Sequence, residues 1–79
     1  MIVRKIKIET IEKVKEFVKE ISKIDAAAEL TIPGRRYIID AKSIMGIFSL
    51  DISHPMNLTI YDDEENAWEY EGIFEKFGV

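Results

Sequence analysis

Few side chains in this 79-residue sequence are suited to chemistry, and they form no complete catalytic set. The single histidine, His54, follows Asp51 closely, which gives two candidate metal ligands but no third. The absence of cysteine excludes disulfides, thiolate metal sites and thiol catalysis. No paired carboxylates, nucleophile with an adjacent base or glycine-rich phosphate loop can be assembled. The sequence therefore predicts neither an enzyme nor a metal or cofactor site.

Two hydroxyl side chains, Thr10 and Ser43, precede segments with helical apolar spacing. Each can cap a helix by accepting a hydrogen bond from a backbone N–H of the first turn. Ser43 can also be read as a phosphorylation site. A phosphate there would meet the N-terminal end of a helix and add a charge of about −2 beside the apolar residues that follow. The two roles of Ser43 are compatible.

Composition and charge limit the class of protein. With 47% hydrophobic and 33% charged residues, residues 1–79 are expected to form one globular domain. A net charge of −4 argues against nucleic-acid binding. No apolar run approaches the about 20 residues that cross a bilayer, and the N-terminal residues do not resemble a signal peptide. We therefore expect a cytoplasmic protein with neither a nucleic-acid nor a membrane partner.

The charges are unevenly distributed along the chain. Residues 1–43 hold ten Lys and Arg against seven Asp and Glu, whereas residues 44–79 hold only Lys76 against eight acidic residues. Two solvated faces explain this pattern most simply. The alternative is a dipolar surface that orients a docking partner.

Alternating and helical patterns predict the elements of the first half. Ile2, Ile6 and Ile8 lie on one side of an alternating run, which is typical of a half-buried strand. Residues 11–24 have the spacing of an amphipathic helix that begins after Thr10. Its apolar face is expected to consist of Ile11, Val14, Phe17, Val18, Ile21 and Ile24.

The second half continues with a hairpin, a short helix, a strand and a last helix. Residues 28–32 and 37–39 read as two strands joined at Pro33-Gly34, and residues 56–60 read as another. A short helix begins at Ser43. Asp62-Asp63 are expected to cap one final helix that ends at Gly78. Its apolar stripe is expected to be Ala67, Tyr70, Phe74 and Phe77. The order β-α-β-β-α-β-α indicates an α+β open sandwich.

The most specific motif is K-S-I-M-G-I-F-S-L at residues 42–50. It resembles the segment around the regulatory serine of HPr, the histidine-containing phosphocarrier protein of the bacterial sugar phosphotransferase system. Chain length and element order are also similar to this family, and the sequence similarity is specific from about Gly34 to Ile60. The resemblance implies an HPr-like open-faced β-sandwich, with a four-stranded antiparallel sheet and three helices on one face.

The histidine that carries phosphate in this family has no counterpart here. In the family it begins the first helix, in a G-[IL]-H-A-R-P stretch, and counting back from Ser22–Asp25 places that position at Thr10. The stretch here reads I-E-T-I-E-K, with Glu12 about where the arginine would be. A phosphothreonine ester is too stable for easy relay, and Glu12 would repel an incoming phosphoryl group. We therefore expect no conventional phosphocarrier activity.

The resemblance also implies a docking surface around the short helix and the start of the first helix. Ile47 and Leu50 are the better candidates for the core. Ile44, Met45 and Phe48 are then expected to form an exposed apolar patch, although core packing of all three is the alternative. Lys42 reads either as a neighbour of a phosphate on Ser43 or as a solvated lysine at a strand end. Gly46 is expected to allow close packing of the short helix.

The resemblance therefore predicts a non-enzymatic regulatory or adaptor protein, controlled through Ser43 and active in carbon catabolite repression. The expected partners are an HPr-type kinase and either enzymes of the phosphotransferase system or a transcription regulator. Two alternatives remain. One is an atypical phosphocarrier that uses Thr10 or His54, and the other is an interaction domain that keeps the fold without any phosphorylation.

Overall fold

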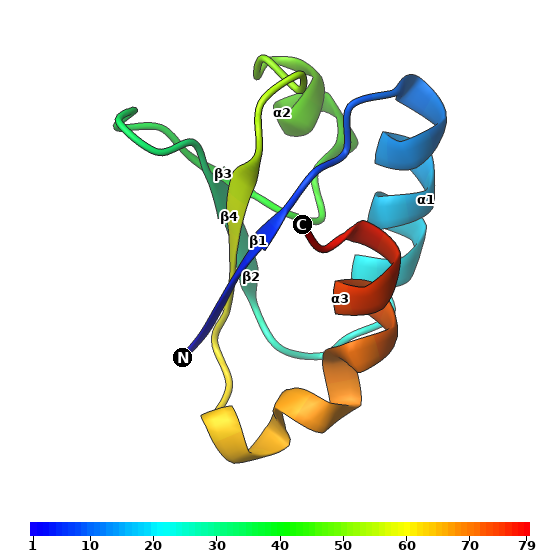
Figure 1. Ribbon diagram of the computed structural model, residues 1–79, viewed down its shortest axis with the longest axis vertical. Helices are drawn as coiled ribbons and strands as arrows, with labels where there is room; N and C mark the ends of the chain where they lie inside the picture. The colour runs from blue at the N-terminus through cyan, green and yellow to red at the C-terminus, as the bar shows by residue number, and fades with distance from the viewer.

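The chain forms an antiparallel sheet with its helices packed on one face (Figure 1). The computed structural model describes residues 1–79. Its elements are, in chain order, β1 (Ile2–Ile6), α1 (Ile11–Ile21), β2 (Ala28–Thr31), β3 (Ile38–Asp40), α2 (Ile44–Phe48), β4 (Met56–Ile60), the 3-10 helix η1 (Glu64–Tyr70) and α3 (Glu71–Phe77). The four strands lie in the order β1-β4-β2-β3. The predicted α+β order and the four-stranded antiparallel sheet with three helices are thus confirmed, with η1 as an addition.

Alternation along the strands places one set of side chains between the sheet and the helices. Ile2 lies opposite Ile60 across β1 and β4, and Leu58 lies opposite Leu30 across β4 and β2. Helices α1 and α3 meet over this layer, where the rings of Phe17 and Phe77 pack edge to face at 5.3 Å. The core holds sixteen buried residues and none of them is polar or charged, so its stability comes from apolar burial.

The first helix begins as predicted but buries less of its apolar face. Thr10 caps it by accepting a hydrogen bond from the Lys13 N–H at 3.1 Å, and Glu12 lies in its first turn. Val14 is the first buried residue of α1, whereas Ile11 is 56% exposed. The expectation that Ile11 joins the buried face was wrong, because the core that covers Val14 does not extend to the first turn.

The single final helix predicted from residue 62 onward was also wrong. The segment is divided into η1 and α3, and Asp63, the residue before η1, makes no side-chain capping bond. The carboxylate of Asp62 instead accepts hydrogen bonds from the Asn66 amide at 2.9 Å and from the Tyr70 hydroxyl. Asp62 thus accepts hydrogen bonds from two side chains of η1 instead of capping an α-helix.

The two edge strands of the sheet, β1 and β3, differ in whether further backbone bonds to them. Beside β1, the C-terminal residues form a short bridge in which Gly78 lies opposite Ile6. The Lys7 N–H donates to the Phe77 carbonyl at 2.8 Å. Gly78 ends α3 as predicted, and a Cβ at this position would lie 2.2 Å from the Phe74 carbonyl oxygen, which only glycine avoids. At the opposite edge, β3 has no neighbour beyond β2.

Candidate functional site

Helix α2 and the first turn of α1 lie at the same end of the molecule, together with the loop that leads into β4 (Figure 1). The predicted phosphorylation site and the position predicted to correspond to the family histidine are therefore found at one end.

Ser43 is the N-cap of α2, as its position in the sequence predicts. Its backbone is extended, and its Oγ accepts a hydrogen bond from the Gly46 N–H at 3.1 Å. The Ser43 N–H donates to the Asp40 carbonyl at 3.0 Å. The side chain is half-buried. These bonds fix the hydroxyl at the junction between β3 and α2.

Gly46 allows α2 to lie close to β3, which confirms the role expected for it. A Cβ at this position would be 2.8 Å from Cγ2 of Ile39 and 3.1 Å from Oγ of Ser43. Both distances are shorter than ordinary van der Waals contact. The glycine therefore sets the distance between the short helix, the last strand of the hairpin and the serine.

The outer side of α2 is apolar and open to solvent. Met45 is 77% exposed and Phe48 is 40% exposed, whereas Ile47 is fully buried. Ile44 is half-buried and packs against the core, so the expectation of an exposed patch was right for Met45 and Phe48 but wrong for Ile44, which lies at the inner border of that patch. We call Ile44, Met45 and Phe48 the α2 surface. Ile11 is a further exposed apolar residue, in the first turn of α1, which lies at the same end of the molecule as α2 (Figure 1).

Lys42 makes two hydrogen bonds within the chain. Its ammonium donates to the Ile24 carbonyl at 2.7 Å, and its backbone N–H donates to the Asp40 carboxylate at 2.9 Å. The ammonium therefore ties the start of α2 to the segment that follows α1, and it is not simply a solvated lysine. The sequence does not reveal this contact, because donor and acceptor are 18 residues apart.

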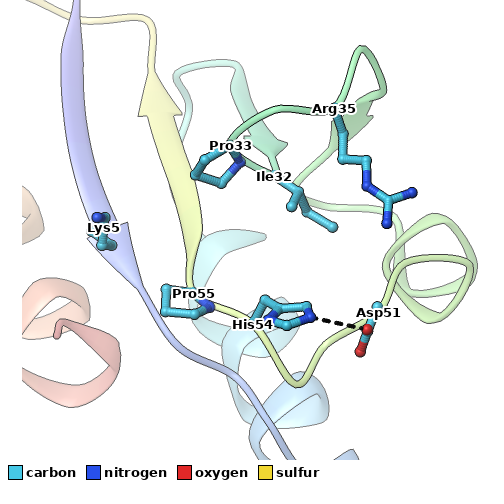
Figure 2. Close-up of a pocket in the computed structure, with 7 residues that line it drawn as sticks. All are labelled: Lys5, Ile32, Pro33, Arg35, Asp51, His54 and Pro55. Atoms are coloured by element: carbon cyan, nitrogen blue, oxygen red, sulfur yellow. Dashed lines mark ion pairs between the residues drawn. The ribbon is translucent and has the colours of Figure 1, made fainter.

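His54 lies in a hollow on the side of the loop that precedes β4 (Figure 2). Its Nε2 is 3.3 Å from Oδ2 of Asp51. The backbone N–H and hydroxyl of Ser53 donate to the other oxygen of Asp51, at 3.1 and 2.6 Å. These bonds, with a smaller contribution from the neighbouring His54 and Arg35, hold the pKa of the Asp51 carboxyl below its usual range.

The same hollow has a volume of about 420 Å³ and is also lined by two cationic side chains from other segments. Lys5 comes from β1 and Arg35 from the loop of the hairpin, so three separate segments contribute charged side chains. The apolar side chains that complete its wall are Ile32, Pro33 and Pro55. The sequence pairs His54 only with the nearby Asp51, because Lys5 and Arg35 lie in segments distant along the chain.

Neither a metal site nor a membrane span is found. No cluster of three or more His, Cys, Asp or Glu side chains is placed so that it could hold a metal ion. None of the helices has the length and apolar character needed to cross a membrane.

Comparisons with known proteins agree with the fold and with the motif at residues 42–50. The family model described as "PTS HPr component phosphorylation site" matches residues 12–71, a range that begins after Thr10 and includes Ser43 and all of α2. A similar solved structure is the crystal structure of HPr-C-His from Thermoanaerobacter tengcongensis, with 27% sequence identity and a TM-score of 0.71. The alignment covers 94% of this chain and 90% of that one. A search of curated protein sequences gives no match.

Proposed function

This chain belongs to the HPr family of the bacterial sugar phosphotransferase system, and from this premise we propose that it is a regulatory or adaptor protein controlled at Ser43. In this proposal an HPr-type kinase phosphorylates Ser43, and partner proteins dock on the α2 surface. The observation that carries the proposal is the position of Ser43 directly before an exposed apolar helix face.

The charge around Ser43 supports control by phosphorylation. Residues 44–50 contain no ionisable side chain, so the outer side of α2 is uncharged. A phosphoserine carries about −1.5 to −2 charges at neutral pH and three strong acceptor oxygens. Such a group at the start of α2 would therefore be the dominant charge beside Met45 and Phe48. A partner that buries these side chains would have to desolvate or pair the phosphate, and its affinity would change.

Relay of phosphate through the start of α1 is disfavoured by the residues there. Thr10 already acts as a capping acceptor, and Glu12 adds a negative charge in the first turn. A phosphoryl group transferred to this point would meet an acidic side chain where a cation is needed. We therefore propose that this protein does not carry phosphate at Thr10.

Truncation of the α2 surface tests the docking role. We expect Met45→Ala combined with Phe48→Ala to weaken binding to the HPr-type kinase by about tenfold or more, because truncating a hot-spot residue at the centre of an interface costs over about 1 kcal/mol. Titration calorimetry with the purified kinase measures this. Trp68→Ala is the matched control, since Trp68 is an exposed apolar residue on η1. Equal binding by the double variant and by the control would refute docking through α2.

One observation favours a second candidate function, an atypical phosphocarrier. The only imidazole of the chain lies in a hollow that is also lined by the cationic Lys5 and Arg35, with the Asp51 carboxylate 3.3 Å from its Nε2. If this candidate is right, phosphoenolpyruvate and the first enzyme of the phosphotransferase system label the protein with an acid-labile phosphate. His54→Gln would then abolish the label. No label on the wild-type chain, with ordinary HPr charged in the same tube, removes this candidate.

A further inference from the structure

The β3 edge of the sheet is an open strand with apolar side chains. At the opposite edge the C-terminal residues bond to β1 at Lys5–Lys7, whereas β3 has no neighbour beyond β2. Ile38 within β3 and Tyr37 just before it are 63% and 65% exposed. Exposed apolar strand edges are sites at which sheets pair with another chain.

The backbone groups of this edge point outward in a regular pattern. The Ala41 N–H donates to the Ala28 carbonyl at 2.9 Å, so the backbone of Ala41 faces β2. In an antiparallel pair, alternate residues direct their N–H and C=O groups to the same side. Ile39, which lies opposite Leu30, therefore also faces β2. The N–H and C=O groups of Ile38, and the N–H of Asp40, are directed away from the sheet.

The side chains along this edge form a self-complementary sequence, R-Y-I-I-D at residues 36–40. We propose that β3 pairs in antiparallel fashion with β3 of a second copy of this chain, centred on Ile38. In this register each Ile38 lies opposite the other, each Tyr37 opposite Ile39 of the second copy, and each Arg36 opposite Asp40 of the second copy. The two sheets then join into one.

This register satisfies both the backbone and the side chains. Because the Ile38 groups face outward, the central pair exchanges two backbone hydrogen bonds. The Asp40 carbonyl already accepts the Ser43 N–H, so the Arg36 N–H of the second copy shares this acceptor through its second lone pair, and the Asp40 N–H donates to the Arg36 carbonyl of the second copy. Aromatic against β-branched pairs and opposite charges across strands are each favourable. A shift by one residue per strand would place Arg36 opposite a neutral or like-charged side chain.

The charge pattern selects a second copy over an unrelated partner. One strand supplies both the cation and the anion, at equal distances from Ile38, so a two-fold axis pairs both. The contact involves only residues 36–40 of each copy, far fewer than the about 20–30 residues a side of stable complexes. The dimer is therefore weak and depends on protein concentration, with half association expected only in the high-micromolar range or above.

Substitutions that reverse the charge of Arg36 or Asp40 test whether β3 pairs with a second copy. Sedimentation equilibrium over a concentration series measures the mass, and amide chemical shifts in NMR spectra locate the contact. We expect concentration-dependent dimerisation of the wild type, with shifts confined to residues 36–40 and their neighbours. Arg36→Asp places two acids opposite each other and should weaken the dimer at least tenfold. Arg35→Asp makes the same change of charge one residue away and should leave the dimer unchanged.

A mixture of two variants distinguishes pairing from misfolding. Arg36→Asp and Asp40→Arg each repel their own copies, but a mixed dimer restores both opposite-charge pairs, so mixing equal amounts should restore association. Thermal melts show that each variant is folded before mixing. A wild type that stays monomeric at millimolar concentration overturns the proposal. Equal weakening of the dimer by Arg36→Asp and Arg35→Asp would also overturn it. A mixture of Arg36→Asp and Asp40→Arg that stays monomeric would do the same.

Discussion

The hydroxyl of Ser43 has a structural role that must be separated from any regulatory one. As the N-cap of α2 it accepts the Gly46 N–H, and any substitution that removes the acceptor also removes the phosphorylation site. Asparagine is as good an N-cap as serine but cannot be phosphorylated in the same way. Comparing alanine with asparagine at position 43 therefore separates the two roles.

We predict that Ser43→Ala lowers the free energy of unfolding by about 1 kcal/mol, because an unmade cap leaves the first turn of α2 without its acceptor. Ser43→Asn should stay within a few tenths of a kcal/mol of the wild type. Urea denaturation measures both. If alanine is as stable as serine, the capping bond contributes nothing to folding.

The hydrogen bond between Tyr70 and Asp62 gives the protein a dependence on pH at both ends of the scale. The Tyr70 hydroxyl donates to the carboxylate, which raises the pKa of Tyr70 to about 12 and lowers the pKa of Asp62 below its usual range. Because the folded state favours the Asp62 carboxylate, its contribution to the free energy of unfolding is fully present above the pKa of about 4 that Asp has in the unfolded chain. This contribution is lost as the pH falls below that value. The folded state also favours the protonated phenol of Tyr70, so the contribution of this phenol to the free energy of unfolding is lost as the pH rises from about 10 toward 12.

Tyr70→Phe should therefore be less stable than the wild type at pH 7, and the difference should shrink both in strong acid and above about pH 10. Denaturant titrations at several pH values measure it. Tyr37→Phe is the control, because Tyr37 is exposed and lies away from the core. A difference between Tyr70→Phe and wild type that stays constant from pH 3 to pH 11 would contradict this explanation.

Residue-level features were predictable only where the contact is local. The caps at Thr10 and Ser43 follow from residues three positions apart in each case. The bond of Lys42 to the Ile24 carbonyl was not predictable, nor was the hollow that Lys5, Arg35 and His54 line together, because both involve segments distant in sequence.

At the scale of elements, α2 depends on close packing against β3. We predict that Gly46→Ala destabilises the protein by about 1–3 kcal/mol, because its Cβ would overlap Cγ2 of Ile39 at 2.8 Å. Gly72→Ala is the matched control within α3, where a Cβ meets no atom within 4 Å. It should be neutral or stabilise by up to about 1 kcal/mol, since alanine favours a helix. Equal effects of the two substitutions in thermal melts would show that close packing at Gly46 is not required.

Strands and the first two helices were predictable from periodicity, whereas the last helix was not. The apolar spacing of residues 67–77 is helical, and it correctly places Tyr70 and Phe77 in the core. It cannot show that the Asp62 side chain bonds to Asn66 and Tyr70, which accompanies a 3-10 turn before α3. Periodicity likewise assigned Ile11 to the buried face without revealing where the core ends.

At the scale of the whole molecule, the uneven charges partly pair with each other. Arg4 from the basic half contacts Glu64 at 2.7 Å and lies over the Phe74 ring at 5.3 Å, and Lys76 contacts Glu16 at 3.7 Å. The alternation in each strand predicted which side chains enter the core, but the strand order β1-β4-β2-β3 could be expected only through the resemblance to HPr. The location of Ser43 and the α2 surface at one end of the molecule was expected in the same way.

The most direct test of the central claim is the intact mass of the protein after incubation with ATP and an HPr-type kinase, followed by peptide mapping. We predict one added phosphate on Ser43 of the wild type and none on Ser43→Asn, which keeps the cap. An unmodified wild-type chain, with ordinary HPr fully labelled in the same reaction, would contradict this prediction and would leave Ser43 as a helix cap alone.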